Sequence, residues 1–278
     1  MQTATAPSTA TASPFGSQLR SWREMRGHSQ MALALAAGVS TRHVSYLETG
    51  KASPSREMVV SLTNAMEVPL RGRNQLLMAA GFAPLYAETP LDAPALGPVR
   101  EALKFVLKAM EPHPTFIVNR RYDLVDANDT GRWVLKTFTV DLEKFSQPTN
   151  LVELIIRPDG MLPFIQNREE VQRKVLQRLR RDLGGVTSRD ARDAQLLEEI
   201  EPVLKGLGVP KTPAEVMPMI AGLNLRKGDL ALNLFTTIAT IGTAQDVTLQ
   251  ETRIETLFAA DEGTRDTLNS RIGGNDRC

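Results

Sequence analysis

The chain has 278 residues, of which 42% are hydrophobic and 23% charged, and this composition excludes a chain that is disordered throughout. The formal net charge is only +1, but the first 82 residues carry eight basic and four acidic side chains, whereas the remainder carries 25 and 28. This segregation predicts that only the N-terminal part meets a polyanion such as the phosphate backbone of DNA.

Residues 1–13 begin the chain with Ala, Thr, Ser and Pro, without the basic segment and apolar core of a secretory signal. We expect a flexible tail here. Residues 29–51 then predict two short helices joined by a tight turn. Ser29 and Ser40 are suited to cap them, and Gly38 supplies the left-handed turn residue.

Apolar residues at helical spacing predict further helices around this pair. One precedes it, another follows it, and a third over 70–80 stops at Gly81. The apolar positions that we expect to be buried are Phe15, Leu19, Trp22, Leu33, Ala34, Ala37, Val44, Leu47, Val59, Leu62, Met66, Leu76, Leu77 and Ala80.

The outward side of the helix that begins after Ser40 carries hydroxyls, a guanidinium and an aromatic ring, which suit the major groove of DNA. We expect Thr41, Arg42 and Tyr46 to contact bases, although a pure phosphate contact for Arg42 is an equal alternative. The other candidates position the protein on phosphates. The predicted DNA-binding residues are Gln30, Ser40, Thr41, Arg42, Ser45, Tyr46 and Lys51.

Four motifs occur within residues 14–66: Ser29-Gln30, Gly38-Val39-Ser40, Glu48-x-Gly50-Lys51 and Pro54-Ser55. With them the segment resembles the Xre-type, or phage-repressor-like, helix-turn-helix family. The resemblance implies an all-α helix-turn-helix bundle over residues 14–82 that binds DNA. It also implies a partly buried ion pair between Arg23 and Glu48.

Four prolines within residues 83–98 predict a linker between two domains. Beyond it, the apolar pattern predicts a helix over 99–110, a hairpin and three more helices. The hairpin strands are expected at Thr115–Val118 and Leu124–Ala127, and the helices at Leu151–Ile156, Arg168–Leu183 and Ala191–Leu207. Two long strands, over 230–238 and 247–258, are expected to follow, with a loop at 242–246 between them.

This second part also contains six recognisable motifs: Glu111-Pro-x-Pro114, Asn119-Arg-Arg-Tyr-Asp-Leu-Val-Asp-Ala-Asn128, Asn150-Leu-x-x-Leu-Ile, Pro158-x-Gly160, Thr236-Thr-x-x-Thr-x-Gly-Thr243 and Gln245-Asp-Val-Thr-Leu-Gln-Glu-Thr-Arg-Ile-Glu255. It resembles the MmyB-like ligand-binding domain. The resemblance implies an α+β PAS-like domain over residues 99–265, with a tail at 266–278. It further implies a transcription factor that binds a small hydrophobic ligand, with a medium-chain or long-chain fatty acid as the suggested effector.

Several apolar residues of the second domain are candidates for lining a ligand pocket, although an ordinary packed core needs the same residue types. The candidates are Phe116, Val118, Trp133, Phe164, Leu234 and Ile254. Arg120 and Arg121, at the hairpin tip, are candidates for a carboxylate site, with a solvated tip as the alternative.

We expect no enzyme, no catalytic residue and no metal site, because no serine elbow, thiol nucleophile or zinc-ligand spacing occurs. The single cysteine, Cys278, fits a reducing cytoplasm, and no apolar run approaches the ~20 residues that cross a bilayer. The expected protein is therefore a cytoplasmic regulator.

Its expected partners are double-stranded DNA, a hydrophobic effector and a second copy of itself. Two recognition helices about 34 Å apart would read a palindrome. The alternative is a DNA-binding regulator whose second domain is a ligand-free module for dimerisation or partner docking.

Overall fold

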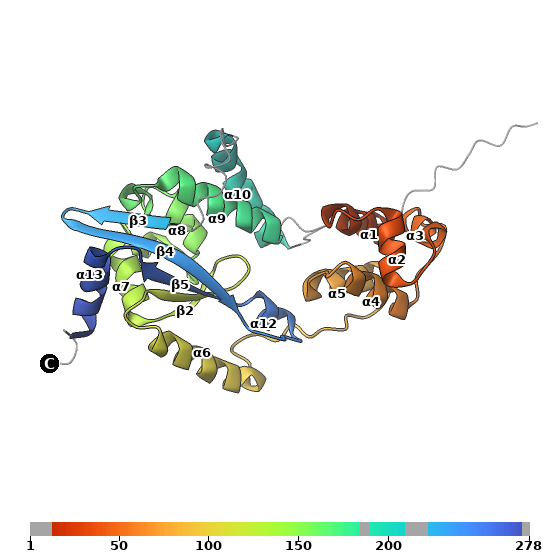
Figure 1. Cartoon of the computed structure of the whole chain (residues 1–278), viewed down its shortest axis with the longest axis horizontal. Coiled ribbons are helices and arrows are strands. Elements are labelled where there is room, and N and C mark those ends of the chain that lie inside the picture. Colours follow the sequence, from red (N-terminus) through yellow and green to blue (C-terminus); the bar gives the residue numbers. More distant parts are fainter. Residues whose placement is uncertain (1–12, 184–189, 209–221, 274–278) are drawn as a thin grey trace, which may run out of the picture. The chain divides into compact units, whose positions relative to one another are not determined.

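The computed structural model describes residues 13–183, 190–208 and 222–273, which divide into two compact units near Glu88 (Figure 1). The tail expected at 1–13 therefore lies outside the described residues except for Ser13. The N-terminal unit contains the helices α1 (Pro14–Met25), α2 (Gln30–Ala37), α3 (Thr41–Glu48), α4 (Arg56–Ala65) and α5 (Leu70–Ala79).

The first four helices all begin at a serine, because the side chain accepts a hydrogen bond from a backbone N–H of the first turn. These caps are Ser13, Ser29, Ser40 and Ser55. Helix α2 ends at Gly38, whose φ of 68° is left-handed, and the Val39 N–H then bonds to the carbonyl of Ala34. The tight turn predicted between α2 and α3 is confirmed.

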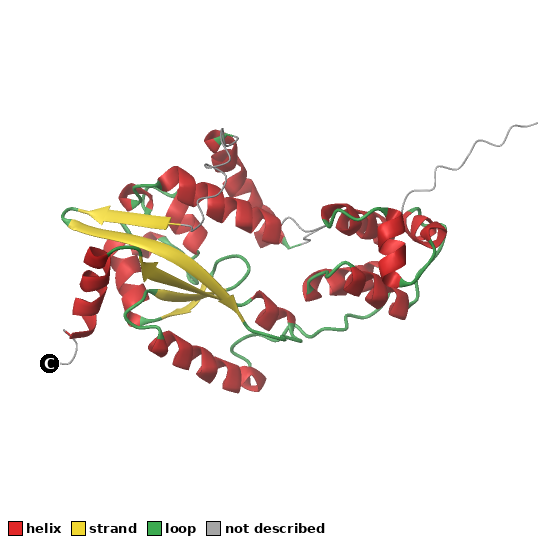
Figure 2. Ribbon diagram, in the orientation of Figure 1, coloured by secondary structure: helices red, strands yellow, loops and turns green. Residues whose placement is uncertain are grey.

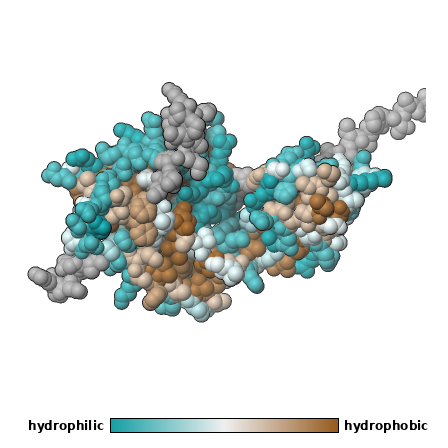
Figure 3. Space-filling model, viewed as in Figure 1, coloured by the Kyte–Doolittle hydropathy of each residue, from teal (hydrophilic) through white to brown (hydrophobic). Residues whose placement is uncertain are grey.

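The helices of this unit enclose one hydrophobic core, which confirms the helical spacing read from the sequence, except that Ala37 and Ala80 are only partly buried against it. Leu33, Val44 and Leu47 are fully buried. The core consists of Phe15, Leu19, Trp22, Leu33, Ala34, Val44, Leu47, Val59, Leu62, Met66, Val68, Leu76 and Leu77. Met31 and Leu35, on the outer side of α2, are instead 69% and 85% exposed. The space-filling view shows hydrophobic residues interrupting the hydrophilic surface of both units (Figure 3).

The C-terminal unit is built on a five-stranded antiparallel sheet in the order β2-β1-β5-β4-β3 (Figure 2). Its strands are β1 (Thr115–Val118), β2 (Leu124–Ala127), β3 (Gly222–Lys227), β4 (Leu230–Thr240) and β5 (Arg253–Ala259). The predicted hairpin of β1 and β2 is confirmed, with the bounds expected from the sequence.

Helices cover both faces of this sheet. Leu103 and Leu107 of α6 (Gly97–Ala109) pack against Ile117 on one face. The other face carries the larger core, which α7 (Asp129–Phe138), α8 (Leu151–Ile156), α9 (Arg168–Leu183), α10 (Ala191–Leu207) and α13 (Glu262–Gly273) supply with buried side chains. Three of these, α8, α9 and α10, have the bounds predicted from the sequence.

The sequence-based assignment was wrong at four places in this unit. The segment 247–258 is not one strand: a short helix, α12 (Val247–Glu251), precedes β5. Strand β3 and helix α7 were missed, and α13 covers most of the tail expected at 266–278; residues 274–278 lie outside the described residues.

Candidate DNA-binding surface and ligand cavity

The polar side of α3 carries most of the predicted DNA-binding residues. Thr41 and Arg42 are exposed in its first turn, and Ser45 and Tyr46 are half-buried one turn later. The Ser40 side chain is used as the cap of this helix and accepts from the His43 N–H at 3.1 Å. The polar side chains of α3 therefore point away from the core, while Val44 and Leu47 are buried and hold the helix against it.

Tyr46 lies at the centre of a small cationic cluster on this surface. Arg42 Nε donates to the Tyr46 hydroxyl at 2.8 Å, which leaves the two Nη groups for a bidentate contact. Lys51 Nζ lies 5.9 Å from the centre of the Tyr46 ring. Lys51 is brought back to Tyr46 because Gly50 ends α3 with a φ of 74° and the Lys51 N–H bonds to the Tyr46 carbonyl at 2.8 Å.

Arg23 and Glu48 form the buried ion pair that the resemblance implied. Arg23 Nε lies 2.5 Å from Glu48 Oε1 and Nη2 lies 3.1 Å from Oε2, a bidentate geometry that joins α1 to the end of α3. Arg23 Nη1 also donates to the His28 carbonyl at 2.8 Å. The hydrogen bond to Glu48 raises the pKa of Arg23 above its ordinary value.

Gln30 takes part in the same network, and its phosphate contact stays a prediction. Its Nε2 donates to Glu48 Oε2 at 2.8 Å. The side chain therefore lies at the start of α2 with one donor committed to Glu48, and this position links the helix N-terminus to the end of α3.

The second site is a cavity of about 100 Å³ in the C-terminal unit, between the sheet and α7, α8 and α9. Most of its lining is apolar. The residues that line it are Phe116, Tyr122, Val134, Leu135, Leu151, Ile155, Met161, Val171, Lys174, Val175, Arg178, Gly222, Leu223, Thr236, Glu255 and Leu257.

Three of these residues form a polar end of the cavity. Arg178 Nη1 donates to the Tyr122 hydroxyl at 3.3 Å and lies 3.6 Å from Glu255 Oε1. Glu255 faces Phe116 and Ile238 across the neighbouring strands, and its Oε1 is buried without a hydrogen bond. An ionisable group among apolar strand neighbours is unusual in a core and typical of a binding site.

The environment shifts the protonation of both Glu255 and Tyr122. Burial raises the pKa of Glu255, and the nearby Arg178 and Arg253 oppose this shift only in part. Burial, assisted by the Glu255 carboxyl, raises the pKa of Tyr122 to about 12. Near neutral pH, Tyr122 therefore keeps its hydroxyl proton, and Glu255 holds its proton to a higher pH than an exposed carboxyl would.

Of the six predicted pocket residues, only Phe116 lines this cavity. Val118 and Leu234 are packed in the core of the same face. Ile254 lies on the opposite face, paired with Ile117 under α6, because successive residues of a strand point to opposite sides.

The remaining two candidates, Trp133 and Phe164, pack against the edge of the core and not on the cavity. Arg271 lies 4.4 Å from the ring centre of Trp133, and Lys227 lies 5.0 Å from that of Phe164. Sequence reasoning did not select Tyr122, Arg178 or Glu255. Tyr122 and Glu255 both stand in motifs quoted above, but the sequence alone did not show which face of the sheet Glu255 occupies.

Comparison with known families agrees with this two-part arrangement. The sequence profile described as the MmyB-like transcription regulator ligand binding domain matches residues 99–270, which is more than half of the chain. The chain belongs to this family. A profile described as a helix-turn-helix domain matches residues 14–76, so the MmyB-like domain follows a helix-turn-helix domain in this protein.

Curated relatives match over a short stretch of the chain. Uncharacterized HTH-type transcriptional regulators of Mycobacterium bovis and Mycobacterium tuberculosis are 40% identical over 65 residues, which is 23% of this chain. The match spans 25% of the length of these relatives. The names of these relatives agree with the helix-turn-helix profile match.

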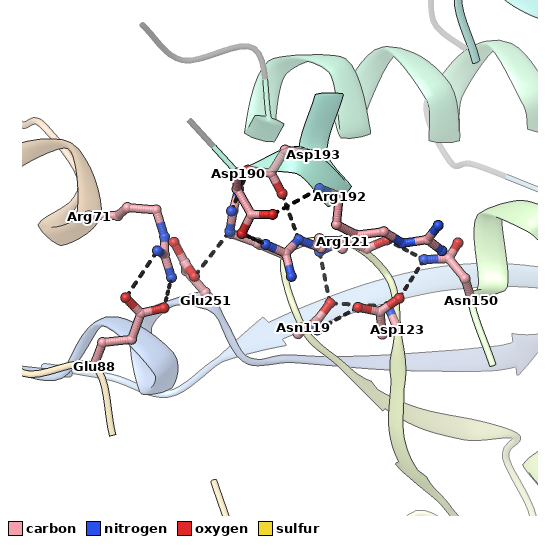
Figure 4. A network of polar contacts seen from close by, with 11 residues as sticks. Arg71, Glu88, Asn119, Arg121, Asp123, Asn150, Asp190, Arg192, Asp193 and Glu251 are labelled. Atoms are coloured by element: carbon pink, nitrogen blue, oxygen red, sulfur yellow. Dashed lines mark hydrogen bonds and ion pairs between the residues drawn. The ribbon is translucent and has the colours of Figure 1, made fainter. Parts of the chain in front are cut away.

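In the MmyB-like domain, Arg120 and Arg121 are engaged in ion pairs within the chain and do not form a solvated hairpin tip. Both bond to Asp193 of α10, at 2.5 and 2.6 Å (Figure 4). Asp193 is fully buried, and Arg121 also pairs with Asp190. The hairpin tip is thus attached to α10 by ion pairs.

The turn of the hairpin is held by amides. Asn119 Oδ1 accepts from the N–H groups of Arg121 and Asp123, and Asn150 Nδ2 donates to Asp123 Oδ1 at 2.8 Å (Figure 4). These bonds fix the turn in which Tyr122 adopts a left-handed φ of 68° with its side chain buried. The polar motif read from the sequence therefore positions one wall of the cavity.

Within the described residues, no group of three His, Cys, Asp or Glu side chains is arranged to hold a metal ion. No helix among residues 13–183, 190–208 and 222–273 has the length and hydrophobicity required to cross a bilayer.

Proposed function

We propose that this chain is a sequence-specific DNA-binding transcription regulator whose MmyB-like domain binds a small hydrophobic effector. The observation that carries the DNA-binding part is the α3 surface, where Thr41, Arg42 and Tyr46 extend from a helix held by a rigid hydrophobic back. Such a helix fits the width of the major groove.

The cluster of Arg42, Tyr46 and Lys51 supports distinct roles for its members. The Nη groups of Arg42 can bond guanine bidentately, and Tyr46 can reach a base edge or a phosphate. Lys51 supplies a mobile charge that suits a phosphate. We further propose a homodimer on a palindromic operator, because one recognition helix buries too little surface for tight specific binding. This role requires a cytoplasmic protein, in the compartment that holds the DNA.

The experiment is selection of bound sites from random DNA, followed by binding measurements with single variants. Arg42→Ala and Tyr46→Ala are expected to relax the sequence preference, at about 1–3 kcal/mol for a lost bidentate contact. Lys51→Ala is expected to weaken binding to all sequences about equally and to lower the salt slope by about one. Equal losses on cognate and random DNA for all three variants would contradict base reading by α3.

The cavity supports the effector part. It is mainly apolar, with one polar end, which is the usual composition of a small-molecule site. The strand order 2-1-5-4-3, with helices between the second and third strands, supports a PAS-like sensor fold. A fatty acid remains the suggested effector, although a volume of about 100 Å³ requires the cavity to widen for a medium or long chain.

The small volume also favours a second candidate function, in which this domain is a ligand-free module for dimerisation or partner docking. Native mass spectrometry and lipid extraction of the purified protein separate the two. A co-purified small molecule supports the effector, whereas a stable dimer of the bare chain mass that binds no member of a fatty-acid panel supports the module.

A further inference from the structure

The segment predicted as a linker, residues 83–98, is fastened to the N-terminal unit at its first end. Asn74 of α5 is buried, and its Oδ1 accepts from the N–H groups of Leu85 and Tyr86 at 3.0 and 3.1 Å. Its Nδ2 donates to the Tyr86 carbonyl at 2.7 Å. One side-chain amide therefore holds the backbone of two consecutive linker residues through both its donor and its acceptor.

Two arginines of α5 add to this attachment. Arg73 Nη1 donates to the Tyr86 hydroxyl at 3.2 Å, and the Arg73 guanidinium lies 5.8 Å from the centre of that ring. Arg71 forms an ion pair with Glu88, in which Nη1 donates to Oε2 at 3.1 Å (Figure 4). Residues 85–88 are thus bonded along their length to the last helix of the N-terminal unit.

The other end of the linker is fastened to the C-terminal unit. Arg100 of α6 donates through Nη1 to the carbonyls of Leu91 and Ala93, at 2.7 Å each. The Ala93 N–H donates to the Pro90 carbonyl at 2.9 Å, so the chain turns directly after the proline. The Leu91 side chain packs against the apolar cluster between α6 and the sheet. From Leu91 onward, the linker is therefore bonded to the C-terminal unit.

Thr89 and Pro90 lie between these two fastened stretches. Pro90 has a fixed φ, and a residue that precedes proline is restricted to extended backbone. The three Cα–Cα steps from Glu88 to Leu91 reach about 11 Å at most. A flexible chain over the whole of residues 83–98 would instead have a root-mean-square end-to-end distance of about 20–24 Å. The connection between the two fastened stretches is therefore short and has few rotatable bonds.

We propose that Asn74 and Arg100 determine which spacing of operator half-sites the protein accepts, because they shorten the connection between the two units. The inference rests on the proposed homodimer on a palindromic operator, and it takes that dimer to be held together by its C-terminal units. In such a dimer, the length of each connection limits where each α3 can reach on the DNA. Two short connections restrict the pair of α3 helices to a narrow range of half-site separations.

The geometry of DNA sets the size of the expected effect. Moving one half-site by two base pairs shifts it by about 7 Å along the helix axis and rotates it by about 70°. A short connection with a restricted backbone accommodates this change only by breaking the bonds of Asn74 or Arg100. A linker released over residues 83–98 accommodates it easily, because the free energy of a flexible chain depends only weakly on such changes.

The experiment measures binding of the full chain to the selected palindrome and to versions whose half-sites are moved together or apart by two base pairs. The wild type should lose at least about tenfold in affinity at each altered spacing. Asn74→Ala and Arg100→Ala, which each weaken one attachment, should lose less than about threefold. An insertion of Gly-Ser-Gly-Ser between Thr89 and Pro90 should behave in the same way with every attachment intact, so the test does not depend on the folding of either substitution.

Lys104→Ala is the matched control for Arg100→Ala. Lys104 is an exposed residue one turn further along α6, and it pairs with Glu101 of the same helix at 3.0 Å. This variant should keep the wild-type preference for one spacing.

Hydrogen exchange tests the attachment itself without DNA. The Leu85 and Tyr86 amides should be protected in the wild type, and Asn74→Ala should speed their exchange at least about tenfold. Wild-type amides that exchange as fast as those of an unstructured peptide overturn this inference and leave the regulator proposal standing. Paired half-sites that the wild type binds equally at all three spacings, or an insertion variant as selective as the wild type, do the same. If selection returns no paired half-sites, the homodimer proposal fails and this inference fails with it.

Discussion

Each unit of the molecule places an arginine opposite a glutamate away from water, and the two pairs differ in how completely they are bonded. Arg23 and Glu48 meet through two hydrogen bonds, and Gln30 adds a third to the same carboxylate. Arg178 and Glu255 lie 3.6 Å apart, and the Glu255 Oε1 atom has no hydrogen bond.

The difference follows from what surrounds each pair. In the N-terminal unit the side chains of Arg23 and Glu48 are buried, and both find their partners within the fold. Arg178 and Glu255 line a cavity, where a partner can come from outside the chain. The fully bonded pair of the N-terminal unit fits a structural role, and the pair beside the cavity supports the proposed effector site.

The largest expected effect comes from breaking the bonded pair. Glu48→Ala leaves Arg23 buried without its carboxylate, and we expect the free energy of unfolding of the N-terminal unit to fall by about 3 kcal/mol. Urea denaturation followed by tryptophan fluorescence measures this, since Trp22 lies in the same core. Glu24→Ala is the comparison: it removes an exposed carboxylate that pairs with Arg20 and lies 3.5 Å from Arg23, so it should lower the free energy of unfolding by less than about 1 kcal/mol. A similar loss in both variants would show that the Arg23–Glu48 pair is not special.

The Arg178–Glu255 pair should behave in the opposite way: removing its carboxylate should not destabilise the fold. Glu255→Gln removes a buried ionisable group without changing its shape, so the variant should be as stable as the wild type near pH 4.5 and more stable at higher pH. The raised pKa of Glu255 in the folded state means that the wild type loses stability as pH rises above the unfolded value, with a slope of at most about 1.4 kcal/mol per pH unit.

Unfolding curves for both proteins between pH 4.5 and 8 measure this difference. The gap between them should widen with pH and become constant above the folded pKa of Glu255. A constant gap over the whole range would mean that Glu255 titrates alike in the folded and unfolded chains.

The two units also differ in how much of their structure could be predicted from the sequence. The helices of the N-terminal unit follow from local rules, because Ser29, Gly38 and Ser40 act on residues within one turn of themselves. The Arg23–Glu48 pair joins residues 25 positions apart and came only from family resemblance. Candidate DNA-binding residues could be selected because the outer side of one short helix is fixed by its buried side.

The cavity could not be predicted in this way. It is formed by residues from the hairpin turn, α9 and β5, whose proximity depends on the sheet order. Ile254 was chosen and Glu255 was not, because α12 occupies the first part of the segment and the strand phase could not be set without it. The same residue types line a cavity and fill a packed core, so the sequence could not separate the two. Five of the six pocket candidates therefore do not line the cavity.

A smaller effect is expected from Gln30, which donates the third hydrogen bond to Glu48. Gln30→Ala removes the hydrogen bond to Glu48 but leaves the two bonds of Arg23, so we expect a loss of about 1 kcal/mol in the free energy of unfolding. The same variant tested on DNA reports on the predicted phosphate contact. Weaker binding at a protein concentration where the variant is fully folded would separate that contact from the structural bond.

The smallest effect is expected on the outer side of α2. Leu35 is 85% exposed, so Leu35→Ala removes almost no buried area, and we expect the free energy of unfolding to change by less than about 0.5 kcal/mol. Leu33→Ala is the matched control: the same substitution two residues away, at a fully buried position, should cost about 2–5 kcal/mol. Urea midpoints of the two variants test this. A large loss for Leu35→Ala would mean that another surface covers this side of α2 in solution, and its dependence on protein concentration would then tell whether that surface belongs to a second copy of the chain.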